Sequence, residues 1–299
     1  MNSQQKILII GFGDVAERLA RLLAPRHRIY ALVRKPERAA LARSLGVSPV
    51  SGDLANRASL VRIAGLADTV FHFAPPPNHG QLDRHTRNLI GALSRPANFQ
   101  RPGMLPQRLI YISTTGVYGD CGGQHIDETR PINPQTARAV RRVDAETALR
   151  AWGKRSGVAI SILRAPGIYA ADRLPIGRLH QGTPALALAD DVFTNHIHAD
   201  DLALAALQAA YRALPNRIYN IVDDSDMYMG DYFDIVADHF KLPRPPRVKR
   251  AEAASQIGPA MLSFMSESRR IGNTRLTEEL GFLLRYPTVN DFLRQLKPT

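Results

Sequence analysis

Residues 6–23 of the chain read KILIIGFGDVAERLARLL, and this stretch decides the fold. Four apolar residues follow Lys6 and lead into Gly11, which is typical of a buried strand that enters a tight turn. From Asp14 onward, apolar residues recur at helical spacing, namely Val15, Leu19, Leu22 and Leu23. A strand, a glycine turn and a helix in this order predict the first unit of a parallel α/β sheet.

The turn itself carries a binding pattern. Gly11, Gly13 and Ala16 fit G-x-G-x-x-G/A, which binds a dinucleotide when it links a strand to a helix. Backbone N–H groups at the start of that helix would face a pyrophosphate. We therefore expect the coenzyme to contact Gly11, Phe12, Gly13, Asp14 and Val15. The alternative is a turn with a structural role only.

The rest of the chain alternates between the two element types. Apolar patterning predicts strands at residues 28–33, 47–51, 69–73, 108–113, 160–164 and 218–222. It predicts helices at residues 37–45, 58–64, 83–93, 135–154, 201–213, 228–240, 251–266 and 277–280. This alternation predicts an α/β protein, a doubly wound Rossmann parallel sheet with a smaller C-terminal substrate lobe. We assign residues 1–165 to the Rossmann domain and 166–299 mainly to the lobe, with some segments returning to the sheet.

Composition excludes several classes of protein. The 299 residues are 44% hydrophobic and 22% charged, as in an ordinary globular protein. No apolar run approaches the roughly 20 residues that cross a bilayer, and no signal-peptide core precedes Lys6, so we expect a cytoplasmic protein without a membrane partner. The single cysteine, Cys121, excludes an internal disulfide, and no cluster has metal-site spacing, so we expect no metal. The net charge of +12 includes one basic run at residues 244–250, which lacks aromatic residues and argues against nucleic-acid binding.

The end of the second strand favours one coenzyme. An acid there would bind a ribose 2′-hydroxyl, whereas an arginine accommodates a 2′-phosphate. The strand ends in Val33-Arg34-Lys35, so we favour NADP over NAD, unless Arg34 is only a solvated charge. Asp53 and Leu54 follow the third strand and are expected at the adenine, although Asp53 is alternatively a helix cap. Along the middle of the coenzyme we expect Phe73, Ala74 and Pro75.

Several later segments resemble one family. They are residues 112–119 (ISTTGVYG), 162–169 (ILRAPGIY), 195–203 (NHIHADDLA), 219–221 (YNI), 268–276 (SRRIGNTRL) and 279–282 (ELGF). Together with the glycine turn, and in this order, they resemble the short-chain dehydrogenase/reductase superfamily, in its extended and atypical branches, the NAD-dependent epimerase/dehydratase group. The resemblance runs almost from end to end and implies a nicotinamide-coenzyme enzyme.

The resemblance also implies site residues. It places Thr114 near the substrate carbonyl, and Ser113, Pro166 and Ile168 at the coenzyme. The family's catalytic tyrosine falls on Arg138, and its lysine, four residues later, falls on Arg142. An arginine holds its proton too tightly to act as a proton shuttle at neutral pH, so Arg138 cannot replace the tyrosine.

Other residues must then supply the missing functions. Tyr118 is the nearest phenol to Thr114 in the sequence and is our candidate proton donor, although a packing role is the alternative. Weaker candidates are His79, His85 and Tyr169. Arg138 and Arg142 share a helix face, where the pair would grip a phosphate or carboxylate, with Arg142 replacing the lysine at the coenzyme. The alternative is a solvated arginine face.

Two functions remain open. The first is an NAD(P)-dependent oxidoreductase or epimerase-like enzyme that acts on a small polar or sugar-nucleotide-like substrate. The second is a non-catalytic NAD(P)-binding sensor or scaffold that lacks the Tyr/Lys pair. His196 and His198 alternate along an extended segment, so we expect polar structural roles for them. A homodimer through the helix at residues 135–154 is implied by the resemblance alone.

Overall fold

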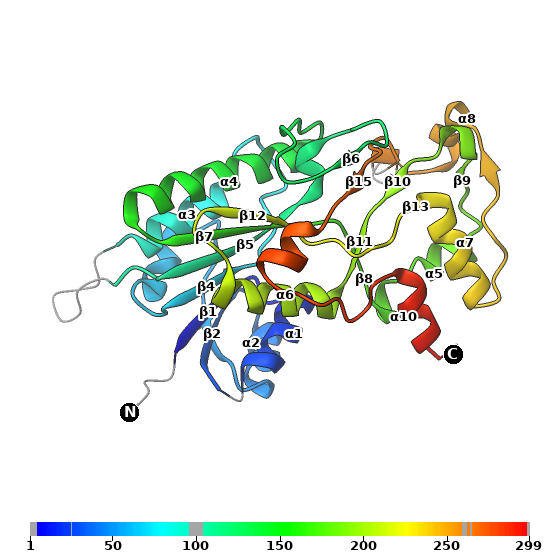
Figure 1. The fold of residues 1–299 in the computed structure, drawn as a ribbon. Helices are drawn as coiled ribbons and strands as arrows, with labels where there is room; N and C mark the ends of the chain where they lie inside the picture. The colour runs from blue at the N-terminus through cyan, green and yellow to red at the C-terminus, as the bar shows by residue number, and fades with distance from the viewer. Residues whose placement is uncertain (1–4, 25, 96–103, 259–261, 264, 298–299) are drawn as a thin grey trace.

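The computed structural model describes residues 5–24, 26–95, 104–258, 262–263 and 265–297. Seven parallel strands form the central sheet, in the spatial order β12-β7-β5-β4-β1-β2-β3 (Figure 1). The strands are β1 Lys6–Ile10, β2 Arg28–Val33, β3 Ser48–Ser51, β4 Thr69–His72, β5 Arg108–Thr114, β7 Ala159–Ala165 and β12 Arg217–Asn220. The predicted doubly wound parallel sheet is thus confirmed.

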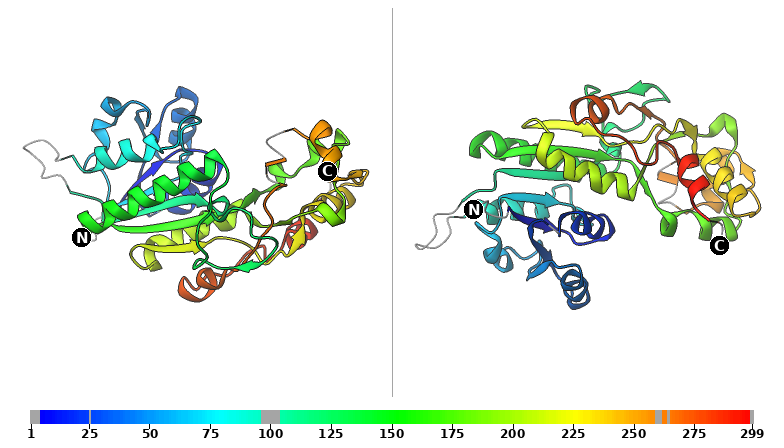
Figure 2. Two further views of the ribbon diagram at one scale, coloured as in Figure 1. Left: turned by 90° about the horizontal axis from the view of Figure 1, so that it is seen from above. Right: turned by 60° about the horizontal axis from the view of Figure 1, so that its bottom comes forward.

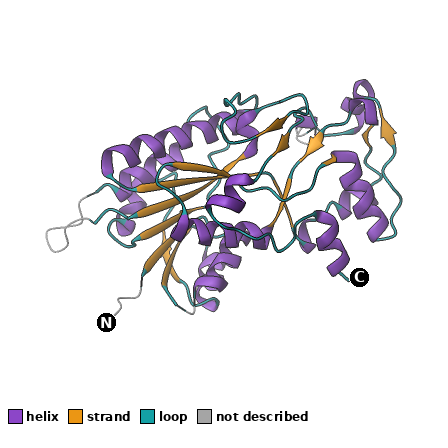
Figure 3. Ribbon diagram, in the orientation of Figure 1, coloured by secondary structure: helices purple, strands orange, loops and turns teal. Residues whose placement is uncertain are grey.

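Helices cover both faces of the sheet (Figures 1 and 3). One face carries α1 Asp14–Leu23, α2 Pro36–Ser44 and α6 Ala199–Arg212. The other carries the 3₁₀ helix η1 Arg57–Ile63, α3 Arg84–Leu93 and α4 Ala137–Ser156. Alternate residues of β1 enter different cores, since Ile7 and Ile9 pack with the first group and Leu8 and Ile10 with the second. A strand buried on both faces needs a continuous apolar sequence, which residues 7–10 provide.

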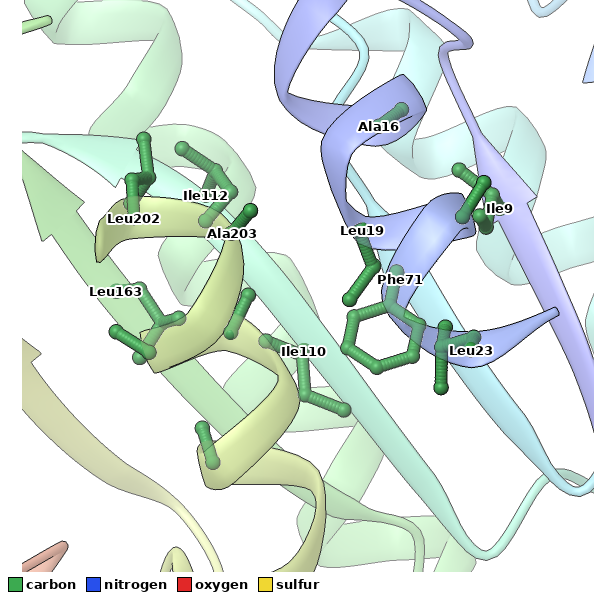
Figure 4. Packing of buried hydrophobic residues seen from close by; sticks show 14 of the residues in the cluster. Ile9, Ala16, Leu19, Leu23, Phe71, Ile110, Ile112, Leu163, Leu202 and Ala203 are labelled. Carbon is green, nitrogen blue, oxygen red and sulfur yellow. The ribbon is translucent and has the colours of Figure 1, made fainter. Parts of the chain in front are cut away.

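The core on the α1 face joins segments from the whole chain. Leu19 of α1 and Leu202 of α6 lie over the sheet near Ile110 of β5 (Figure 4). All three side chains are at least 99% buried. α6 and β12 come from the later half of the chain. Their packing therefore joins that half to the sheet formed by the earlier strands.

A smaller lobe lies at one end of the sheet (Figure 2). Its own apolar cluster includes Tyr169, Phe233 and Phe292. Its helices are α5 Ile176–His180, α7 Met229–His239, α8 Arg250–Gln256 and α10 Val289–Gln295, with short strands β8 Gly167–Tyr169, β9 Ala185–Leu186, β10 Phe193–Thr194, β11 His196–His198, β13 Met227–Tyr228 and β14 Arg247–Val248. Further short elements are β6 His125–Ile126 paired with β15 Arg270–Ile271, the 3₁₀ helices η2 Thr115–Tyr118, η3 Ala171–Arg173 and η4 Leu188–Asp190, and the π-helix η5 Arg275–Glu279.

Three predicted helices differ from the structure. Residues 58–64 form η1, a 3₁₀ helix that Asn56 caps through its side chain, instead of an α-helix. The helix predicted at residues 277–280 is η5, which begins two residues earlier. The helix predicted over residues 251–266 is shorter, since α8 ends at Gln256, and residues 259–261 and 264 lie outside the described part. Of the helices described, none has the length and apolar character that crossing a membrane requires.

Candidate functional site

The site lies at the point of the sheet where the order of the strands reverses. β2 and β4 flank β1 on opposite sides, so the turns after β1 and β4 face each other, as at the ligand site of other doubly wound sheets. Gly11 follows β1 with φ of +87°, a conformation that favours glycine. A Cβ there would lie 2.5 Å from the backbone nitrogen of Ala74, which follows β4. Only glycine therefore fits this turn.

The start of α1 lies beside that turn. Gly13 is the N-cap, and no side chain caps the helix, so the first backbone N–H groups remain available for an anion. A Cβ on Gly13 would contact nothing within 4 Å, so the protein itself does not require glycine there. The Asp14 carboxylate forms ion pairs with Arg18, at 3.0 Å, and with Arg173, at 3.2 Å. Gly13, Asp14 and Val15 line neither of the two cavities described next.

A small cavity of about 250 Å³ opens beside the first turn. Seven predicted coenzyme residues line it, namely Gly11, Phe12, Arg34, Asp53, Leu54, Ala74 and Pro75. Lys35, Arg38 and His85 also line it, and sequence reasoning did not assign them to the coenzyme. Lys35 and Arg38 follow Arg34 closely in the sequence. Their positive charges after the second strand could have indicated that they also line the coenzyme site.

The charges around the small cavity are mostly positive. Arg34 is exposed and lies 3.8 Å from the Asp53 carboxylate, a separation at which the ion pair is weak. Arg38 pairs with Glu17 at 2.6 Å. Asp53 accepts a hydrogen bond from the Ala55 backbone N–H at 2.9 Å and so forms a local turn, while Asn56 caps η1. The helix-cap alternative for Asp53 is therefore wrong.

A large cavity of about 710 Å³ lies between the sheet edge and the lobe. Three predicted residues line it: Thr114, Pro166 and Ile168. The rest of its wall includes Thr115, Gly116, Arg138, Arg173, Asn195, His196, Met229, Tyr232, Glu267 and Arg269. Thr114 Oγ1 accepts a hydrogen bond from the Gly116 backbone N–H at 3.2 Å, which leaves its own hydroxyl proton available to a ligand.

Ser113 and Tyr118 are not at either cavity. Ser113 is buried and donates to Glu146 at 2.5 Å, and Glu146 is paired with the buried Arg164 at 2.7 Å. Tyr118 is 1% exposed and donates to Asn220 Oδ1 at 2.8 Å. Burial raises the pKa of the Tyr118 hydroxyl, which further disfavours proton exchange. Burial and these internal hydrogen bonds argue against Tyr118 as proton donor and Ser113 as a coenzyme contact.

Arg138 and Arg142 point to different surroundings. Arg142 is buried and donates to the Tyr111 hydroxyl and the Ile112 carbonyl, both at 2.9 Å. Arg138 is exposed on the wall of the large cavity. Arg142 lines neither cavity and binds neutral protein groups, so the structure does not bring the two guanidinium groups together at one cavity wall. Phe73, also predicted at the coenzyme, is packed against the core and lines neither cavity.

The weaker proton-donor candidates are also dispersed. His85 lines the small cavity, and its Nδ1 lies 3.2 Å from the Pro75 carbonyl. His79 is exposed and lines neither cavity. Tyr169 is buried in the lobe core. None of the three reaches the wall of the large cavity.

The sequence analysis assigned His196 only a polar structural role. It lines the large cavity, although only 5% of its surface is exposed, and it lies against the Tyr232 ring with centroids 4.3 Å apart. Among the residues described, none bonds to either of its ring nitrogens, and Nδ1 is fully buried. Burial lowers the pKa of His196 to about 4, so the imidazole is neutral at pH 7. β11 pairs His196 with Gly167, immediately after Pro166, which explains why it reaches the cavity.

Known proteins resemble this chain over long ranges. Protein YeeZ from Escherichia coli (strain K12) is 27% identical over 180 residues, and the match covers 60% of this chain and 59% of YeeZ, less than two thirds of that relative. The 4-hydroxy-2-methyl-3-oxo-4-farnesyl-3,4-dihydroquinoline-1-oxide ketoreductase from Stigmatella aurantiaca is 25% identical, over 91% of this chain and 84% of that protein. The structure of a functionally unknown conserved protein from Silicibacter pomeroyi DSS is 28% identical, with a TM-score of 0.78 and 97% of each chain covered.

A family model gives the assignment. The model of the NAD dependent epimerase/dehydratase family matches residues 7–222, which begin in β1 and end just beyond β12. The match therefore includes every strand of the central sheet, the glycine turn and the walls of the small cavity. The chain belongs to the NAD dependent epimerase/dehydratase family.

Proposed function

We propose that this protein is an oxidoreductase that prefers NADP(H) and acts on a small polar substrate in the large cavity. One observation carries the proposal. The small cavity at the glycine turn and the large cavity lie at the same edge of the sheet, where β5 and β7 pair Thr114 with Ala165. Pro166 follows directly and lines the large cavity, so a dinucleotide laid along this edge would reach Thr114.

The preference for NADP rests on the small cavity. Arg34, Lys35 and Arg38 line it together, and the acid that lines it, Asp53, is 3.8 Å from Arg34. A 2′-phosphate would meet these cations with charge-assisted hydrogen bonds, each stronger than a bond between neutral groups. The family description names NAD, so the measurement below decides between the two coenzymes.

The chemistry uses few of the chain's own groups. A bound nicotinamide coenzyme supplies or accepts the hydride. Thr114 donates a hydrogen bond to the substrate oxygen, because its Oγ1 already accepts from Gly116. The hydroxyl proton lost when an alcohol is oxidised passes to water in the cavity, and water returns a proton when a carbonyl is reduced. Met229 and Tyr232 also line this cavity.

Replacing Arg34 by alanine tests the coenzyme preference. We expect NADPH affinity to fall at least about 10-fold and NADH affinity to stay unchanged, because a charge-assisted bond is worth about 1.5–3 kcal/mol. Fluorescence titration with each coenzyme measures this change. Arg43→Ala is the matched control, since Arg43 is an exposed residue of α2 that lines neither cavity. Equal affinity of the natural chain for both coenzymes would contradict the preference.

Replacing Thr114 by valine tests catalysis. Oxidation of NADPH is followed with a panel of aldehydes, ketones and oxo acids, and the variant should turn over about 100-fold more slowly, as when one oxyanion donor is lost. Thr129→Val is the control, because Thr129 is exposed and away from both cavities. An unchanged rate in Thr114→Val would remove this assignment.

One observation favours a second function, a coenzyme sensor or scaffold without catalysis. α4 carries Arg138 and Arg142 where the family resemblance expects tyrosine and lysine, and the Tyr118 hydroxyl is committed to Asn220. This function predicts tight coenzyme binding with no reduction of any member of the panel. Steady oxidation of NADPH with any carbonyl would exclude it.

A further inference from the structure

The first two turns of α4 hold three arginines that pair with no acid among the described residues. Arg141 is buried and donates to the Gly80 carbonyl at 2.8 Å, and Arg142 bonds only to neutral oxygens. The Nε atoms of both are buried, and no hydrogen-bond partner for them lies in the described ranges. Arg138 forms no hydrogen bond or ion pair with any residue that the structure describes. None of the three arginines therefore forms an ion pair with an acid in the described part of the protein.

The acids of the same helix are engaged elsewhere. Asp144 pairs with Arg87 at 2.5 Å, and Glu146 pairs with Arg164 at 2.7 Å. The helix dipole adds positive potential at this end of α4. The exposed Arg138 guanidinium is the member of the cluster that a ligand anion can reach.

Arg138 is the member of the cluster that reaches the large cavity. Thr114, which is proposed to hold the reacting oxygen, lines the same cavity, so a ligand there has both side chains on its walls.

The other arginines of this cavity already have acidic partners. Arg173 lies 3.2 Å from Asp14, and Arg269 lies 2.6 Å from Glu267. Among the described residues of the wall, one guanidinium is thus left for a ligand, which matches one negative charge. The planar fork of that guanidinium pairs with a planar carboxylate through two parallel bonds.

We propose that Arg138 binds a carboxylate of the substrate, so that the substrate is a small hydroxy or oxo acid whose carboxylate lies next to the reacting carbon. This inference rests on the proposed function, since it concerns the same cavity. In the sequence, Arg138 stands where the family has its proton-transfer tyrosine. In this protein it instead selects acids over neutral alcohols and ketones.

Calorimetric titration tests the inference without catalysis. Oxamate, oxalate and malonate, none of which can exchange a hydride with the coenzyme, are titrated separately into the protein saturated with NADP⁺. At least one should bind, and Arg138→Gln should weaken that binding at least 10-fold. Arg138→Lys keeps the charge but loses the fork, so it should give an intermediate affinity. Arg150→Gln is the matched control, an exposed arginine of α4 that lines neither cavity, and it should bind like the natural chain.

The outcomes separate the two proposals. Failure to bind NADP⁺ would overturn the proposed function. Binding of NADP⁺ but of none of the three acids, or equal binding of an acid by Arg138→Gln, would overturn this inference alone. Inorganic phosphate is titrated in parallel, and an Arg138-dependent affinity for phosphate above that for every acid would overturn the choice of a carboxylate. Thermal unfolding of each variant confirms that it is folded.

Discussion

At the scale of single residues, two glycines of the first turn have separable roles. Gly11 is required by the protein, because its φ is +87° and a Cβ would meet the Ala74 backbone at 2.5 Å. Gly13 has open space around it and an ordinary φ of −107°. If a pyrophosphate lies over the start of α1, then Gly13 is required by the ligand instead.

Alanine substitutions separate these roles. Gly11→Ala should lower the free energy of unfolding by more than about 1 kcal/mol, because it adds backbone strain and a clash with Ala74. Gly13→Ala should leave unfolding within about 0.5 kcal/mol of the natural chain and weaken NADPH binding strongly. Chemical denaturation and fluorescence titration measure the two quantities. Full coenzyme affinity in Gly13→Ala would show that the pyrophosphate lies elsewhere.

At the scale of elements, the sequence predicted the helices and strands that have a clear apolar pattern of their own. The apolar runs of β1 and β5 have no polar interruption, so a buried parallel strand was the consistent interpretation of each. The start of α4 was placed two residues early, because Thr136 caps the helix through its side chain instead of entering it. The short strands of the lobe escaped prediction because two-residue pairings such as β10 with β13 leave no period to detect.

Site residues were predictable where the backbone decides their place, and not where a distant partner does. Arg34 and Asp53 follow strand ends, so sheet topology alone brings them to the small cavity. Tyr118 was judged by its nearness to Thr114 in the sequence, but its hydroxyl is engaged by Asn220, which is 102 residues away. His196 reaches the large cavity through pairing with Gly167, a contact that the sequence pattern does not contain.

At the scale of the whole molecule, buried histidines couple stability to pH. Burial lowers the pKa of His72 to about 3 and the pKa values of His196 and His198 to about 4. In the unfolded chain these groups take up protons near pH 6.5, whereas the folded chain excludes them. The stability that they contribute is therefore present above pH 6.5 and is lost as the pH falls toward 4.

Asp223 opposes this trend, since burial raises the pKa of its carboxyl to about 7. Between pH 4 and 7 the folded chain holds this proton and the unfolded chain does not, so Asp223 stabilises the fold increasingly as the pH falls. The buried carboxyls of Glu128, Asp191 and Asp201, whose pKa values burial also raises, act with Asp223 at the acid end of this range. We therefore expect the free energy of unfolding to fall by less than about 3 kcal/mol per unit as the pH drops from 6.5, and the slope to flatten toward pH 4.

Urea unfolding at half-unit steps of pH measures this slope, and single substitutions assign it. His196→Asn should remove up to about 1.4 kcal/mol per unit from the slope, because asparagine does not titrate. His180→Asn, which changes an exposed histidine at the end of α5, should leave the slope as it is. A slope equal in both variants would mean that His196 already exchanges protons freely in the folded chain, and its place on the cavity wall would then be solvated. An acid ligand on Arg138 adds a negative charge to the same cavity, so its binding should raise the pKa of His196. The dependence of the free energy of unfolding on pH should then become flatter in the natural chain. In Arg138→Gln, which does not bind the acid, this dependence should stay the same.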